Sequence, residues 1–85
     1  QLNYAVKIAD MKSMNKAAAE LYVSQPALSS TIKDLEEELQ IEIFFRTNRG
    51  IQISPEGEEF LGYARQMVEL NHMIEERYIE KKKKN

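Results

Sequence analysis

Apolar positions in the first half of the chain recur every three or four residues, the spacing of one face of an α-helix. Ser13 and Ser24 each stand before such a run, where a hydroxyl can accept a hydrogen bond from a free backbone N–H group. Pro26 falls in the first turn of a run, where its missing N–H costs nothing. Two helices joined by a short turn are typical of a helix-turn-helix. The pattern predicts three helices, over residues 2–11, from Met14 to about Tyr22, and from Gln25 to about Leu39.

The spacing changes to every second residue at Ile41–Phe44 and again at Ile51–Ile53. This alternation predicts two β-strands. Between them lie residues 46–50, in which Asn48 and Gly50 tolerate the positive φ angles of a hairpin tip. A small β-hairpin, or wing, is therefore expected after the third helix.

A fourth helix is predicted to begin after Ser54, with Pro55 in its first turn, and to continue to about Glu80. Its length, about 26 residues or ~39 Å at 1.5 Å per residue, exceeds what so small a domain can cover. The predicted fold is mainly α: a winged helix-turn-helix, with three helices and a small β-hairpin wing, followed by a long linker or dimerisation helix. We divide the chain into residues 1–54, the winged helix-turn-helix core, and residues 55–85, the linker helix with a lysine-rich tail.

Apolar side chains follow one seam of the fourth predicted helix. A protruding apolar seam needs a partner, so we predict a homodimer through this helix. The alternative is that the stripe packs onto its own domain, which is more plausible for residues 60–67 than for residues 70–78. The seam residues are Phe60, Tyr63, Ala64, Met67, Leu70, Ile74 and Tyr78.

Composition argues against catalysis. The chain has no cysteine, which excludes disulfides and cysteine zinc sites, and its one histidine leaves little room for a His-rich metal site or a Ser-His-Asp triad. His72 has no second ligand nearby in the sequence and is expected to be a surface or seam residue. No apolar run is long enough to span a membrane, and no leader is visible. We expect a cytoplasmic protein that is not an enzyme and has no metal, no cofactor and no membrane partner.

Charge is segregated along the chain, although the net charge of −2 does not suggest a nucleic-acid partner. Residues 1–33 are mainly basic, residues 34–45 are acidic, and Arg46 and Arg49 follow. Binding of a charged partner depends on the local electrostatic field over one face of the protein rather than on the net charge of the chain. We expect the acidic blocks to be solvated helix faces and Lys81–Lys84 to form a solvated tail.

The third predicted helix carries a polar face opposite its apolar stripe. Gln25, Ser29 and Lys33 lie at i, i+4 and i+8, with Pro26 and Ser30 alongside. Glutamine can bond the adenine edge, serine can bond either base, and proline can touch a thymine methyl group. Acids in the second half of the helix would repel phosphates, so only the first turns can enter a major groove. The alternative is an ordinary polar helix face.

Further basic and polar residues flank this face. Asn15 and Lys16, in the first turns of the second helix, are well placed to contact a phosphate, although Lys16 could equally be a solvated lysine. Arg49 at the hairpin tip can reach phosphates or the minor groove. Arg46 follows two phenylalanines at the base of the wing, so a structural hydrogen bond or a DNA contact is open to it.

Four blocks of the sequence occur together in one known family. They are Ser13-x-x-x-Ala17-Ala18-x-x-Leu21-x-Val23-Ser24-Gln25-Pro26-Ala27-Leu28-Ser29, Ile32-x-x-Leu35-Glu36-x-x-Leu39, Phe44-x-Arg46-x-x-Arg49-Gly50 and Ser54-Pro55-x-Gly57. In this combination, which extends over nearly the whole chain, the sequence resembles the N-terminal DNA-binding domain of LysR-type transcriptional regulators in bacteria.

The resemblance implies sequence-specific binding of double-stranded DNA by a homodimer at a dyad-symmetric operator. It also implies that the chain is the DNA-binding fragment of a longer regulator, whose separate domain senses a small metabolite and drives tetramer formation. A winged-helix module for protein–protein contact through the acidic surfaces is the alternative. By the family pattern, the base-facing residues are Gln25, Pro26, Ser29 and Ser30, and the backbone or wing contacts are Lys16, Thr31, Lys33 and Arg49.

The sequence departs from the family pattern at four positions. Ser30 replaces an arginine of many relatives, which removes one strong DNA contact. Gln40 stands where glycine is usual, so a non-glycine residue is expected in a left-handed conformation at a cost of ~1 kcal/mol. Phe45 is expected to be an exposed aromatic, and Ala5, in place of a phenylalanine, predicts lighter packing of the first helix.

Overall fold

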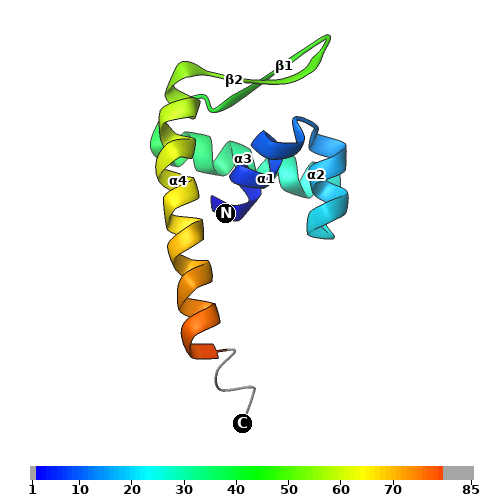
Figure 1. The fold of residues 1–85 in the computed structure, drawn as a ribbon. Helices are drawn as coiled ribbons and strands as arrows, with labels where there is room; N and C mark the ends of the chain where they lie inside the picture. Colours follow the sequence, from blue (N-terminus) through cyan, green and yellow to red (C-terminus); the bar gives the residue numbers. More distant parts are fainter. Residues whose placement is uncertain (1, 80–85) are drawn as a thin grey trace.

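The computed structural model describes residues 2–79 and has the predicted winged helix-turn-helix fold (Figure 1). The first three helices pack together, a two-stranded hairpin lies across one end of them, and the last helix runs past them (Figure 1). The molecule is therefore elongated, with extents of 50 × 25 × 21 Å. The elements are α1 (Leu2–Met11), α2 (Met14–Leu21), α3 (Gln25–Leu39), β1 (Phe44–Thr47), β2 (Gly50–Ile53), α4 (Pro55–Ile74) and the π-helical segment η1 (Glu75–Ile79).

Serine side chains cap three of the helices, as the sequence predicts. The hydroxyl oxygens of Ser13, Ser24 and Ser54 accept hydrogen bonds from backbone N–H groups three residues on, at 3.2, 3.2 and 2.8 Å. Gln40 ends α3 in the left-handed conformation, with φ 56°, which confirms the expectation for that position. Tyr22 ends α2 in the same conformation, so the turn between α2 and α3 is made without glycine.

The core lies where the three helices meet the hairpin and the start of α4. Small residues allow close contact between α1 and α2, and larger ones from α3 fill the centre. Ala5 is fully buried among them. The buried cluster consists of Ala5, Ile8, Ala9, Ala17, Ala18, Leu28, Ile32, Leu35, Ile43, Phe44, Ile51 and Leu61.

The hairpin differs from its prediction in where it begins. The first strand was predicted at Ile41–Phe44, but β1 begins at Phe44 and pairs antiparallel with β2, with Phe44 opposite Ile53 and Thr47 opposite Gly50. The reason is that the preceding amides have other partners. The N–H of Ile41 bonds the carbonyl of Glu36, and the N–H of Ile43 bonds the Glu36 side chain.

The hairpin tip is also built differently from the prediction. Gly50 has a positive φ of 111°, as expected, but Asn48 does not have a positive φ. The Thr47 hydroxyl instead accepts a hydrogen bond from the Arg49 N–H and donates one to the Gly50 carbonyl, both at 3.2 Å. Phe45 of β1 is 40% exposed, as predicted.

Helix α4 packs against the domain at its start and extends beyond it. Leu61 is buried, and Arg65 forms an ion pair with Asp10 of α1 at 2.7 Å. The α-helix ends at Ile74 and continues as η1 to Ile79, whereas one helix to about Glu80 was predicted; Glu80 and the lysine tail lie outside the described residues. Of the helices in residues 2–79, none is both long and apolar enough to cross a membrane.

Candidate nucleic-acid interface

The first turns of α3 present the predicted polar face. Leu28, Ile32 and Leu35 are buried against the core, which turns the opposite side of the helix outward. Pro26, Ser30 and Lys33 are exposed, and Gln25 and Ser29 are half-buried. Thr31 is half-buried, and its hydroxyl donates a hydrogen bond to the Ala27 carbonyl at 3.0 Å.

A hollow of about 390 Å³, here called the basic hollow, lies between the start of α2, the start of α3 and the wing. It brings together four residues that the sequence proposed as DNA contacts from three separate segments: Asn15, Lys16, Gln25 and Arg49. Lys12, which the sequence analysis did not single out, joins them. The full lining is Lys12, Ser13, Met14, Asn15, Lys16, Gln25, Arg46, Thr47, Arg49, Gly50 and Ile51.

A second hollow of about 240 Å³ lies between α3 and the base of the wing. Ser29 and Lys33 line it from α3, and Arg46 lines it from β1. Arg46 thus borders both hollows. It stands opposite Ile51 in the ladder, and residues directly opposite each other point to the same face of a hairpin, here the face turned to the helices. Pro26, Ser30 and Thr31 line neither hollow.

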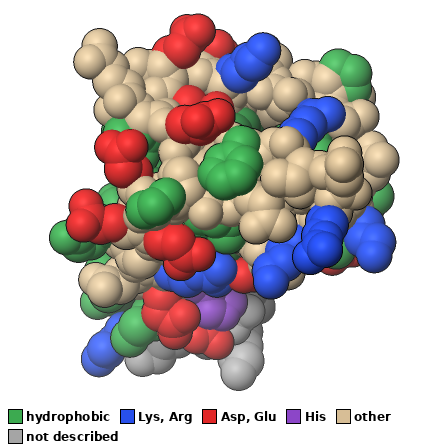
Figure 2. All heavy atoms as spheres, turned by 90° about the horizontal axis from the view of Figure 1, so that it is seen from above, with side chains coloured by type: hydrophobic (Ala, Val, Ile, Leu, Met, Phe, Trp, Pro, Cys, Tyr) green, Lys and Arg blue, Asp and Glu red, His purple; other side chains and the backbone are tan. Residues whose placement is uncertain are grey.

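Positive charge gathers around the basic hollow, which four cations and no acid line, whereas Glu36 and Glu42 join Lys33 and Arg46 in lining the second hollow. In Figure 2, Lys and Arg side chains lie mainly on the side of α2 and the hairpin tip, and Asp and Glu lie mainly on the side of α4. Among residues 2–79, Arg65 forms an ion pair with Asp10, whereas neither Arg46 nor Arg49 lies within ion-pair distance of a described carboxylate. The local field therefore favours an anionic partner despite the net charge of −2.

Glu36 departs from the predicted solvated acidic face. Its carboxylate accepts hydrogen bonds from the backbone N–H groups of Ile43, at 2.7 Å, and Phe44, at 3.1 Å. The two residues that follow it, Glu37 and Glu38, are exposed, as predicted. No local pattern reveals this role, because the partners lie seven and eight residues further along the chain.

The predicted seam of α4 is divided by the structure into two parts. Ala64 is only 1% exposed, which favours the alternative that this part of the stripe packs onto its own domain. Phe60 is half-buried and packs against the core. The remaining five seam residues keep more than half of their surface exposed: Tyr63, Met67, Leu70, Ile74 and Tyr78.

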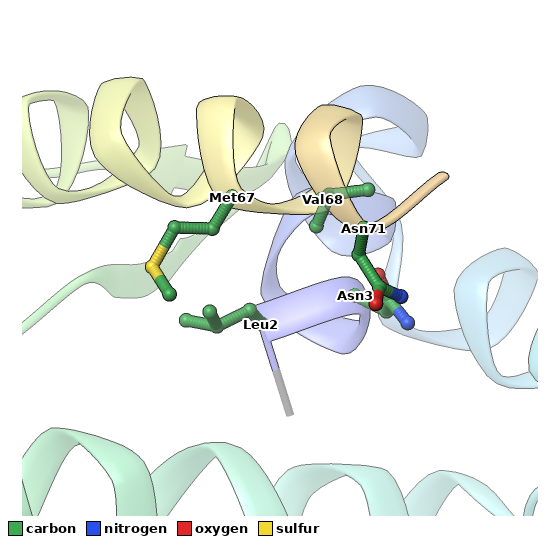
Figure 3. Close-up of a pocket in the computed structure, with 5 residues that line it drawn as sticks. All are labelled: Leu2, Asn3, Met67, Val68 and Asn71. Atoms are coloured by element: carbon green, nitrogen blue, oxygen red, sulfur yellow. The ribbon is translucent and has the colours of Figure 1, made fainter. Parts of the chain in front are cut away.

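A third hollow, of about 280 Å³, lies beside this seam, between the start of α1 and the middle of α4. In Figure 3 the side chains of Leu2 and Met67 point toward the same space, and those of Asn3 and Asn71 lie next to each other. Val68 completes the lining. The sequence analysis did not predict this hollow, because it depends on how α1 packs on α4.

Among residues 2–79, no group of three or more His, Cys, Asp or Glu side chains is placed so that it could hold a metal ion. His72 is exposed on α4, and its Nε2 atom lies 3.8 Å from a carboxylate oxygen of Glu76.

Fold and surface together define a winged helix-turn-helix domain with a basic face over the first turns of its third helix. Residues 1–58 match the family described as "Bacterial regulatory helix-turn-helix protein, lysR family", and the chain belongs to this family. Among curated relatives, it is 50% identical over 52 residues to the uncharacterized HTH-type transcriptional regulator YwbI of Bacillus subtilis, and 41% identical over 70 residues to the HTH-type transcriptional regulator TfdS of Cupriavidus pinatubonensis. These matches include 61% and 82% of the chain but only 17% and 24% of the relatives.

Solved structures of the same family have the same fold. The crystal structure of CbnR, a LysR family transcriptional regulator, matches with a TM-score of 0.84 and 35% identity over 91% of the chain and 27% of CbnR. A complex described as "CbnR_DBD-DNA complex" matches at 0.82 and 35% identity, over 91% of this chain and 88% of that chain. A BenM_DBD/catB site 1 DNA complex matches at 0.78 and 38% identity, over 86% and 80% of the two chains.

Proposed function

We propose that the chain binds double-stranded DNA sequence-specifically, as a homodimer at a dyad-symmetric operator, for transcriptional regulation. The basic hollow carries this proposal, because it gathers cations and hydrogen-bonding side chains beside the exposed start of α3. The similar CbnR and BenM domains are described in complexes with DNA, which supports the same partner for this chain. Binding of chromosomal DNA would place the protein in the bacterial cytoplasm.

The roles of the side chains follow from their places around α3. We assign base contacts to Gln25, Pro26, Ser29 and Ser30, whose types suit the edges of bases in the major groove. Asn15, Lys16, Lys33 and Arg49 would contact the backbone from both sides of the groove. Thr31 would have to give up its hydrogen bond to Ala27 before its hydroxyl could donate to a phosphate.

The dimer is proposed through the exposed part of α4. Met67 and Leu70 are 59% and 58% exposed, and a contiguous apolar face of this kind is typical of an interface. The hollow beside Met67 adjoins this face and offers space for a side chain of the second copy. Two copies related by a dyad would hold their α3 helices over inverted half-sites.

The proposal extends to the larger protein from which such a domain comes. The chain spans about a fifth of the length of the curated relatives that it matches, at 17% and 24%. We therefore place it as the DNA-binding part of a longer, metabolite-responsive regulator. The effector site and the contacts that build a tetramer would belong to a separate domain.

Selection from random duplex DNA at low salt tests this function. An enriched inverted repeat is expected, and Gln25→Ala should then relax the preference at individual base pairs while Lys16→Ala weakens all sites alike. Lys7→Ala, which removes a cation that lines neither hollow, is the matched control and should bind as the unmodified chain does. A folded, dimeric chain that enriches no sequence would contradict the proposal and favour a module for protein–protein contact.

A further inference from the structure

The side chain of Glu36 links α3 to the wing. It is half-buried, and one oxygen, Oε2, accepts both backbone hydrogen bonds, from Ile43 at 2.7 Å and from Phe44 at 3.1 Å. Hydrogen bonds to a charged acceptor are about twice as strong as neutral ones. A single carboxylate of α3 therefore holds the start of β1.

The two ends of the hairpin meet next to Glu36, at Ile43 and Ser54. The carbonyl of Ile43 accepts a hydrogen bond from the N–H of Ser54, at 2.9 Å, and the Ser54 hydroxyl donates to the carbonyl of Glu42. Ile43 itself is fully buried. Since a buried N–H group without a partner is costly, Glu36 determines how the chain leaves α3 and enters the wing.

The wing needs such contacts at its base. A two-stranded hairpin is marginally stable alone, and the three residues of β1 that follow its buried first position are exposed. Arg46 and Arg49 are carried by this hairpin and border the basic hollow. Their positions relative to Gln25 and Ser29 are therefore set at the base of the wing, where Glu36 acts.

We propose that Glu36 is a positioning residue for DNA binding: it holds the wing so that Arg46 and Arg49 reach the duplex while the first turns of α3 read the major groove. This inference rests on the proposed DNA-binding function. Charge alone would give Glu36 the opposite role, because a carboxylate near this face repels phosphates. The two roles therefore predict changes of opposite sign when Glu36 is replaced.

Three variants separate position from charge. Glu36→Ala removes both the charge and the acceptor, Glu36→Gln removes the charge but keeps an acceptor oxygen, and Glu37→Ala removes the same charge from the next, exposed position. Binding is measured by fluorescence anisotropy to one fixed A·T-rich duplex at low salt. We expect Glu37→Ala and Glu36→Gln to bind at least as tightly as the unmodified chain, and Glu36→Ala to bind more weakly.

The decisive readout is the effect of Arg49→Ala in each background. Removing a phosphate-contacting arginine should weaken binding by about tenfold in the unmodified chain and in Glu37→Ala. In Glu36→Ala the loss should fall below about threefold, because the wing no longer presents Arg49 correctly. An undiminished loss in the Glu36→Ala background overturns the inference.

Folding and binding failures are kept apart by two further measurements. Glu36→Asp keeps the charge but is one methylene shorter, so Arg49→Ala should also weaken DNA binding by less than about threefold in this background. If Glu36→Ala does not fold, Glu36→Asp takes its place in the comparison. In the absence of DNA, amide hydrogen exchange at Ile43 and Phe44 should be faster in Glu36→Asp and unchanged in Glu37→Ala. Failure of the unmodified chain to bind the duplex would refute the proposed function, whereas binding with an unchanged Arg49 effect refutes only the role of Glu36.

Discussion

The close approach of α4 to the base of the wing predicts that alanine at position 57 destabilises the domain. A Cβ atom on Gly57 would lie 2.5 Å from the carbonyl oxygen of Ile43 and 3.0 Å from its Cα atom. Both are backbone atoms of a fully buried residue, so no flexible side chain can move aside. Overpacking of this kind costs about 1–3 kcal/mol.

The helix preference of alanine offsets only part of this cost. Alanine is favoured over glycine by about 1 kcal/mol in a helix interior, and by less in a first turn. A net loss of roughly 1–2 kcal/mol should lower the thermal midpoint of Gly57→Ala by about 5–15 °C for a domain of this size. The assay is thermal unfolding followed by circular dichroism at one protein concentration, because dimer formation would make the midpoint depend on concentration.

Gly62 provides the matched control on the same helix. A Cβ atom there meets nothing within 4 Å, and the residue is exposed in the middle of α4. Gly62→Ala should therefore stabilise the domain by up to about 1 kcal/mol and raise the midpoint by roughly 5 °C. A midpoint of Gly57→Ala at or above that of the unmodified chain would refute the packing argument.

Four further outcomes are expected. Gln40→Gly should raise the free energy of unfolding by about 0.5–1 kcal/mol in urea titrations, because it relieves a φ of 56°; a loss would contradict this. Ser54→Ala should lower it by about 1–3 kcal/mol, because a buried hydroxyl bonded to both Gly57 and Glu42 is lost, and an unchanged midpoint would count against that role. Lys16→Ala should reduce the salt dependence of DNA binding by about one unit of slope in titrations across salt concentrations, and an unchanged slope would remove it from the interface. Leu70→Glu should yield monomers in sedimentation experiments, since it places a charge on the exposed apolar face of α4, and a persistent dimer would contradict that interface.

The helices could be predicted from the sequence because their signals are local. The cap at Ser24 and the apolar stripe of Leu28, Ile32 and Leu35 lie within the helix that they define, and α3 has the predicted bounds. The polar face of the same helix follows from the same periodicity. The polar residues in the first turns of α3 are exposed or half-buried, as the periodicity predicts. The candidate interface could therefore be proposed from the sequence.

The base of the wing could not be predicted, because its partners are distant in the sequence. The alternation at Ile41–Phe44 fits a strand, but the N–H of Ile43 is taken by a side chain seven residues earlier. The need for glycine at position 57 likewise depends on a carbonyl fourteen residues away. Ala64 fits the seam by helical spacing, yet α4 turns that position inward, and spacing alone does not say which neighbour covers a face.

The central claim is that DNA contacts the face formed by the start of α2, the first turns of α3 and the wing. Nuclear magnetic resonance titration of the chain with duplex DNA tests it most directly. The account predicts amide shifts concentrated at Lys16, Gln25, Ser29 and Arg49, and little change at the exposed acid Glu38. Shifts concentrated on the acidic end of α3, with none around Gln25, would contradict it.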